Sequence, residues 1–74
     1  MESQIFRIVA FVEAKLTPFA INRLIMLSGV SVRKYGKFSK DDAGDLRKVR
    51  AAVKTLLSAS DHRDLEESLA RPSS

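Results

Sequence analysis

The sequence predicts a small all-α protein, a bundle of four or five helices. Apolar residues recur every three to four positions in residues 5–16 and again in residues 46–57, which is the spacing of one helix face. No segment shows the alternation typical of a half-buried strand. Because the chain has 74 residues and no cysteine, we expect one domain that depends on packing rather than on disulfides.

The first helix is predicted from about Gln4 to Lys15, with Ser3 as its N-cap. Phe6 and Phe11 widen its apolar arc beyond what one neighbouring helix covers. Two interpretations stay open, namely that a later helix packs on these rings or that they form a dimer contact. The core stripe of this helix consists of Ile5, Ile8, Val9, Val12 and Leu16.

The next boundary is Thr17-Pro18, because threonine is a favourable N-cap and proline is tolerated at the first helical position. A second helix is predicted from Pro18 to about Leu27. It is apolar except at Asn22 and Arg23, so we expect it to be central and nearly surrounded by protein. Gly29 then supplies the positive φ angle with which a helix commonly ends.

A third, basic helix is predicted after this turn, from Val32 to about Phe38, with Ser31 as its N-cap. Val30 fills the corner between the two helices, and Tyr35 faces inward together with Leu24. An apolar helix, a glycine turn and a second anchored helix form a helix-turn-helix candidate. The exposed start of the third helix would then enter the major groove of DNA.

The connector at residues 39–45 contains three aspartates, which are placed to cap the start of a fourth helix. This helix is predicted from about Asp42 or Asp45 to Leu57. Its basic residues lie on the side away from the core. Its core stripe consists of Leu46, Val49, Val53, Leu56 and Leu57.

A last short helix is predicted from Asp61 to Ala70, capped at Ser60, with Leu65 and Leu69 one turn apart as its anchors. It docks on the bundle, pairs with another copy of the chain, or frays. The predicted organisation is a helix-turn-helix domain at residues 1–58, this short helix at residues 59–70 and a disordered tail at residues 71–74.

The placement of charge points to a polyanionic partner. The formal net charge is +4. Residues 1–40 hold seven Lys or Arg against two acids, whereas residues 41–74 hold six against seven. Four of the cations fall between Arg33 and Lys40 with no acid among them. Such clustering is typical of a nucleic-acid-binding surface, although a solvated basic face has the same composition.

Other functional classes find little support. The lone histidine, His62, has no cysteine or second histidine to work with, and helix capping explains the aspartates without a metal. There is no glycine-rich phosphate loop. The longest apolar stretch, Ile8 to Val12, is far shorter than a membrane span, and the N-terminus does not resemble a signal peptide. We therefore expect a cytoplasmic protein that is not an enzyme and has no membrane partner, metal or cofactor.

The run Ser28-Gly29-Val30-Ser31, followed by a short basic helix and a later amphipathic helix, resembles the Cro/XRE-type helix-turn-helix family of phage and bacterial repressors. The resemblance covers roughly Ile5 to Leu57. The Thr-Pro opening of the second helix and the run Arg50-Ala51-Ala52-Val53 are similar to short XRE-like proteins of proteobacterial genomes and mobile elements. The resemblance implies a lambda-repressor-like fold and sequence-specific binding of double-stranded DNA.

The resemblance also implies roles for individual residues. Arg33 is the candidate for bidentate bonding to guanine, and Val32 for contact with a thymine methyl group. The implied base-reading residues are Val32, Arg33 and Lys37. The implied phosphate contacts are Thr17, Arg23, Ser31, Lys34 and Lys40, which give affinity rather than sequence choice.

A single short recognition helix makes few contacts, so we expect a homodimer on an inverted-repeat operator, acting as a transcriptional repressor. The candidate dimer contacts are Phe6, Phe11, Leu65 and Leu69. The alternative is a protein-interaction module, an antiactivator or adaptor, with the same bundle, no DNA target and another transcription regulator as partner.

Overall fold

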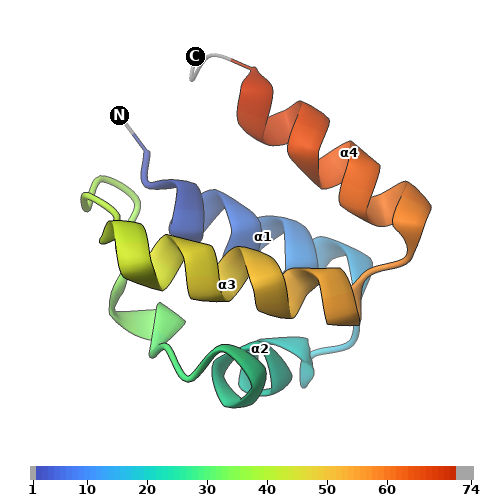
Figure 1. Ribbon diagram of the computed structural model, residues 1–74, viewed down its shortest axis with the longest axis horizontal. Coiled ribbons are helices and arrows are strands. Elements are labelled where there is room, and N and C mark those ends of the chain that lie inside the picture. Colours follow the sequence, from blue (N-terminus) through green and yellow to red (C-terminus); the bar gives the residue numbers. More distant parts are fainter. Residues whose placement is uncertain (1, 72–74) are drawn as a thin grey trace.

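The computed structural model describes residues 2–71, and in this part of the chain it contains four α-helices, one 3-10 turn and no strand. The prediction of a small all-α bundle is confirmed. Figure 1 shows α2 and α4 on opposite sides of α3, with α1 behind it. The elements are α1 (Gln4–Lys15), α2 (Ala20–Ser28), the 3-10 turn η1 (Val32–Lys34), α3 (Ala43–Leu56) and α4 (Ala59–Ala70).

α1 is the central helix, because it contacts α2, η1, α3 and α4. Its predicted limits and its cap are confirmed, since the Ser3 hydroxyl accepts a hydrogen bond from the Phe6 N–H at 2.9 Å. Of its predicted core stripe, Ile5, Ile8 and Val12 are each 0% exposed, whereas Val9 and Leu16 are partly buried against the core. The helical spacing of apolar residues was therefore a reliable guide to which face the bundle covers.

α2 is a surface helix, which corrects the prediction that it is central and nearly surrounded by protein. It packs mainly on α3, and its buried residues are confined to one face. On the other face Met26 is 82% exposed and Leu27 is 51% exposed. An apolar sequence alone did not distinguish a buried helix from one that leaves large apolar side chains in solvent.

The two ends of α2 differ in how well they were predicted. The helix begins at Ala20 rather than Pro18, because residues 17–19 form a turn in which the Ala20 N–H donates to the Thr17 carbonyl at 2.9 Å. The glycine exit is confirmed. Gly29 has a φ of 71°, and its N–H donates to the Ile25 carbonyl at 2.8 Å.

The third predicted helix, Val32 to Phe38, is wrong: the structure has only the 3-10 turn η1. The Ser31 side chain does not cap it, which corrects the predicted N-cap. Tyr35 is already extended, with φ −86° and ψ 110°, and Gly36 follows at a cost of about 1 kcal/mol to any helix. The predicted helix-turn-helix is thus reduced to α2, the Gly29 turn and one short turn.

α3 lies within its predicted limits, and its N-cap Asp42 accepts a hydrogen bond from the Asp45 N–H at 3.0 Å. α4 begins two residues before the predicted Asp61, because Ser58 rather than Ser60 is its cap; the Ser58 hydroxyl accepts from the Asp61 N–H at 3.2 Å. Of the predicted tail, residues 72–74 lie outside the described residues.

α4 docks on the bundle, which decides among the three interpretations of this segment. Leu65 is 1% exposed, and Leu69 packs partly buried against the core. Leu65 is therefore not available to a second copy, and its assignment as a dimer contact is wrong. Phe11 packs against the core, whereas Phe6 is half-buried on the same helix. For Phe6, Phe11 and Leu69 a dimer contact stays a prediction.

Within residues 2–71, none of the helices has the length and apolar character that a membrane crossing requires.

The docking of α4 yields a stability prediction. Leu65→Ala should lower the free energy of unfolding by about 2–5 kcal/mol, because it leaves a cavity between α4 and α1. Met26→Ala is the matched control, since Met26 is 82% exposed and its loss should cost less than about 0.5 kcal/mol. Urea denaturation followed by circular dichroism measures both. Equal losses in the two variants would show that α4 is not docked.

Candidate nucleic-acid interface

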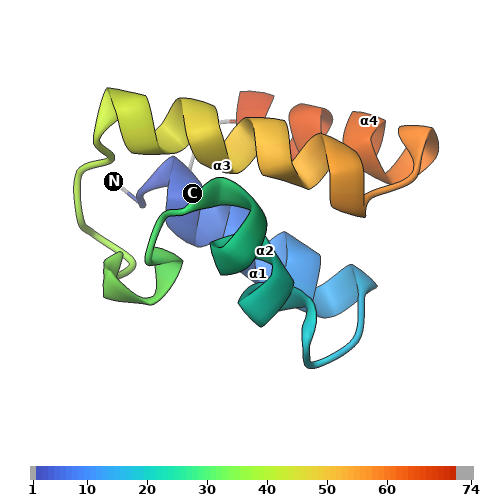
Figure 2. The same ribbon diagram turned by 60° about the horizontal axis from the view of Figure 1, so that its bottom comes forward.

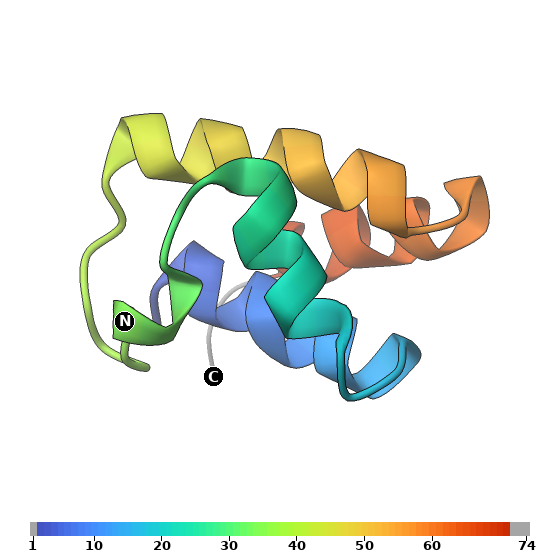
Figure 3. The ribbon, with the colours of Figure 1, turned by 90° about the horizontal axis from the view of Figure 1, so that it is seen from below.

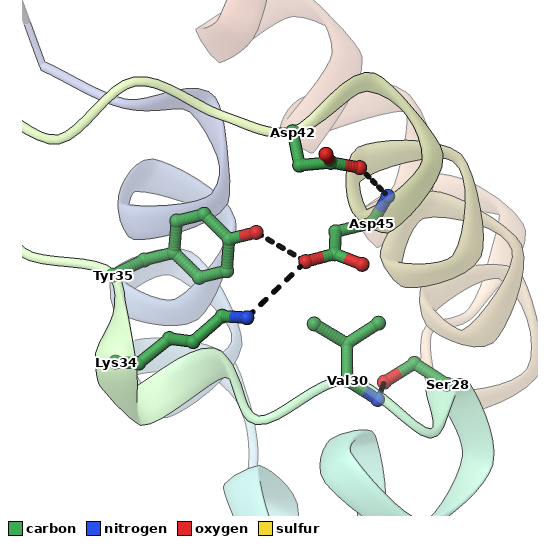
Figure 4. A network of polar contacts seen from close by, with 6 residues as sticks. All are labelled: Ser28, Val30, Lys34, Tyr35, Asp42 and Asp45. Atoms are coloured by element: carbon green, nitrogen blue, oxygen red, sulfur yellow. Dashed lines mark hydrogen bonds and ion pairs between the residues drawn. The ribbon is translucent and has the colours of Figure 1, made fainter.

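The corner after α2 is fixed by a side chain of the helix itself. The Ser28 hydroxyl donates to the Leu24 carbonyl at 2.7 Å and accepts from the Val30 N–H at 3.1 Å (Figure 4). Val30 is 4% exposed, so its side chain is buried at this corner as predicted, although the second helix of the predicted pair is absent. The chain leaving α2 therefore has a defined direction, although no second α-helix follows.

A tyrosine and a carboxylate attach the next segment to α3. The Tyr35 hydroxyl donates to the Asp45 carboxylate, and the Lys34 ammonium lies 3.6 Å from the same oxygen (Figure 4). The hydrogen bond to Asp45 raises the pKa of Tyr35 to about 12. The same bond lowers the pKa of the Asp45 carboxyl below its usual value.

Residues 36–42 are attached to the start of α1. The Asp41 carboxylate accepts hydrogen bonds from the Gln4 and Ile5 N–H groups at 2.6 Å and 3.0 Å. The Ser3 N–H donates to the Lys37 carbonyl at 2.9 Å. Asp41 thus caps the first helix, whereas the sequence prediction placed all three aspartates of this connector at the start of the fourth. Figure 2 shows this segment beside the start of α1.

The predicted base readers do not lie together on one exposed helix. Val32 is 1% exposed, so its assignment to a thymine methyl group is wrong; the side chain is part of the core. Arg33 is exposed, and its guanidinium donates to the Asn22 side-chain oxygen on α2. Lys37 is exposed and lies 3.7 Å from the Glu2 carboxylate.

The predicted phosphate contacts are all accessible to a ligand. Within residues 2–71, no ion pair involves Arg23 or Lys40, whereas Lys34 is paired with Asp45. An exposed ion pair of this kind is weak because solvent screens it, so a phosphate can displace it. The exposed set consists of Thr17, Arg23, Ser31, Lys34 and Lys40.

Asn22 is a further candidate site residue, which was not among those predicted. The outer face of α2 carries Asn22 and Arg23, and the hydrogen bond from Arg33 joins this face to the basic segment at residues 33–40. Figure 3 shows α2 from its outer side, with α1 and α3 behind it. The sequence already contained an indication of this site, because Asn22 and Arg23 are the polar pair within the apolar part of the helix. We call Asn22, Arg23, Arg33, Lys37 and Lys40 the basic face.

The Asp41 cap leads to a second stability prediction. Asp41→Ala should lower the free energy of unfolding by about 1–3 kcal/mol, because two N–H groups at the start of α1 lose their acceptor. Asp64→Ala, at an exposed position of α4, is the control and should change it by less than about 0.5 kcal/mol. Chemical denaturation of both variants measures the difference, and a neutral Asp41→Ala would contradict the cap.

Alkaline titration tests the contact between Tyr35 and Asp45. Tyr35 is the only tyrosine and there is no tryptophan, so tyrosinate absorbance reports this hydroxyl alone. The midpoint should lie near pH 12, and Asp45→Asn should return it towards 10.0. A midpoint near 10.0 in the unaltered folded protein would show that the hydrogen bond is absent.

The contact between Tyr35 and Asp45 also determines how the stability of the fold should change with pH. Because folding raises the pKa of Tyr35 from 10.0 to about 12, its stabilisation is complete below pH 10.0 and is lost as the pH rises through 12. Because folding lowers the pKa of Asp45, its stabilisation is present above pH 3.8 and is lost as the pH falls further. Tyr35→Phe should remove the loss of stability that Tyr35 causes as the pH rises from 10.0 to 12. The measurement is the free energy of unfolding as a function of pH.

Comparison with known proteins does not assign the chain to a family. No family model, curated protein or solved structure matches the chain.

Proposed function

We propose that the chain is a DNA-binding transcriptional regulator of the cytoplasm, which holds double-stranded DNA against its basic face. The observation that carries the proposal is the contact between Arg33 and Asn22, which places two base-reading side-chain types together at the surface beside Arg23. Arginine and asparagine are the side chains that pair with guanine and adenine edges in the major groove.

The cations around this pair supply affinity. Arg23 and Lys40 are exposed, and Lys37 has only a loose pairing with Glu2, 3.7 Å away. Neutralising phosphates with such side chains releases counterions, so binding weakens steeply with salt. Because η1 is too short to lie along a groove as a recognition helix does, phosphate contacts provide most of the binding, and Arg33 and Asn22 provide the sequence choice.

One copy of this face makes few contacts, so a homodimer on an inverted repeat provides useful affinity. Repression then follows from occupying an operator.

One observation favours the alternative, a protein-interaction module without a DNA target. Three large apolar side chains are exposed on or beside α2: Phe19 at 72%, Met26 at 82% and Leu27 at 51%. Exposed apolar side chains grouped on one helix are typical of protein contacts. The same helix thus carries features of both candidate functions, and binding to DNA discriminates between them.

The experiment is a gel shift with DNA from upstream of the chain's own gene, at two salt concentrations. Arg33→Ala should cost about 1–3 kcal/mol of binding free energy and reduce selectivity, whereas Lys40→Ala should weaken binding to all sequences and lower the salt slope by about 1. Arg63→Ala, an exposed arginine on α4, is the matched control and should leave binding unchanged. If Arg33→Ala also leaves it unchanged, the basic face is not the interface. If no DNA binds, the alternative is favoured.

A further inference from the structure

A groove of about 540 Å³ lies between α3 and α4. The two helices are joined at residues 57–58 and diverge from there, and α2 lies on the opposite side of α3 (Figure 1). This volume is within the usual range of ligand-binding clefts. The groove therefore belongs to a surface that the proposed DNA contact does not use.

The groove combines an apolar floor with a cationic rim. Leu46 and Ala51 contribute apolar surface, and Arg47 and Lys54 line the groove from exposed positions of α3. Within residues 2–71, neither Arg47 nor Lys54 takes part in an ion pair. The rim thus keeps positive charge for an incoming ligand.

Arg50 has a different role in the same groove. Its guanidinium is paired with the Glu66 carboxylate of α4 and donates to the Gln4 side-chain oxygen at 3.3 Å. It therefore ties α3 to α4 and to α1, and its charge is largely compensated. The cations available to a ligand are Arg47 and Lys54.

The spacing of these two cations specifies the shape of the ligand. They are seven residues apart on α3, which is two helical turns or about 10 Å. Carboxylates seven residues apart on another helix have the same separation, and apolar side chains between them would reach the floor at Ala51. Helix-in-groove recognition uses apolar anchors at these intervals.

Two other occupants fit less well. A DNA backbone would place its phosphates against the apolar floor at Leu46 and Ala51, which offers them no hydrogen-bond donor. The chain's own acidic helix, α4, has its leucines Leu65 and Leu69 packed on the bundle, so a second copy has no apolar stripe to offer from α4. Charge complementarity therefore selects a foreign helix.

We propose that the groove between α3 and α4 is a docking site for an acidic amphipathic helix of a partner protein, with its carboxylates on Arg47 and Lys54 and its apolar side chains on the floor. This site does not depend on the proposed DNA-binding function. A regulator with both surfaces would hold DNA on α2 and its partner on the other side of α3.

The test uses a synthetic helical peptide with two glutamates seven residues apart and leucines between them, titrated into the isotope-labelled full chain and followed by NMR. We expect amide shifts that map to α3 and α4 around the groove. Arg47→Glu and Lys54→Glu should each weaken the peptide about tenfold or more. Lys48→Glu is the matched control, because Lys48 is an exposed neighbour with the same charge that does not line this groove, and it should change affinity less than about threefold.

Any of the following results would contradict the proposed docking site. An equal loss in Lys48→Glu would show attraction by net charge alone, and undiminished binding of a peptide with serines in place of its leucines would show that the floor is not used. Absence of groove shifts at millimolar peptide overturns the proposal outright. The gel shift separates the two functions: Arg47→Glu should leave DNA affinity within about threefold, and a parallel loss of DNA and peptide binding would assign the groove to DNA instead.

Discussion

The arrangement of this bundle depends on one carboxylate, that of Asp41. It accepts hydrogen bonds from the Gln4 and Ile5 N–H groups, and so joins the middle of the chain to the first turn of the central helix. Residues 35–42 have no regular secondary structure of their own, and this cap together with the Tyr35–Asp45 contact gives them a fixed path. Together with the buried Val32 and the Arg33–Asn22 contact, they hold the basic segment in a defined position relative to α2.

The parts of the fold that depend on local chemistry were predictable. α1 follows from its cap at Ser3 and its apolar spacing, and the exit from α2 follows from Gly29. The error at residues 32–38 has a local cause, the glycine at position 36, and a non-local one. Burial of Val32 and extension of Tyr35 towards Asp45 outweigh the helical pattern, and neither contact is visible in a segment read by itself.

The candidate interface shows the same division. The count of cations at residues 33–40 was sufficient to predict a basic surface. The pairing of these cations with acids could not be predicted in the same way. Lys37 meets Glu2 and Lys34 meets Asp45 only after the bundle forms. The contact between Arg33 and Asn22 joins residues 11 apart across the Gly29 turn, so it follows from the fold and not from a sequence pattern.

The exposure of Met26 makes its sulfur accessible to oxidation on the outer face of α2. Its thioether is outside the core, so oxidation to the sulfoxide adds a polar oxygen where solvent already surrounds the side chain, and the bundle stays folded. Whatever covers this face shields the sulfur from peroxide. The rate of Met26 oxidation therefore reports occupancy of the outer face of α2 in the intact protein, without any substitution or attached label.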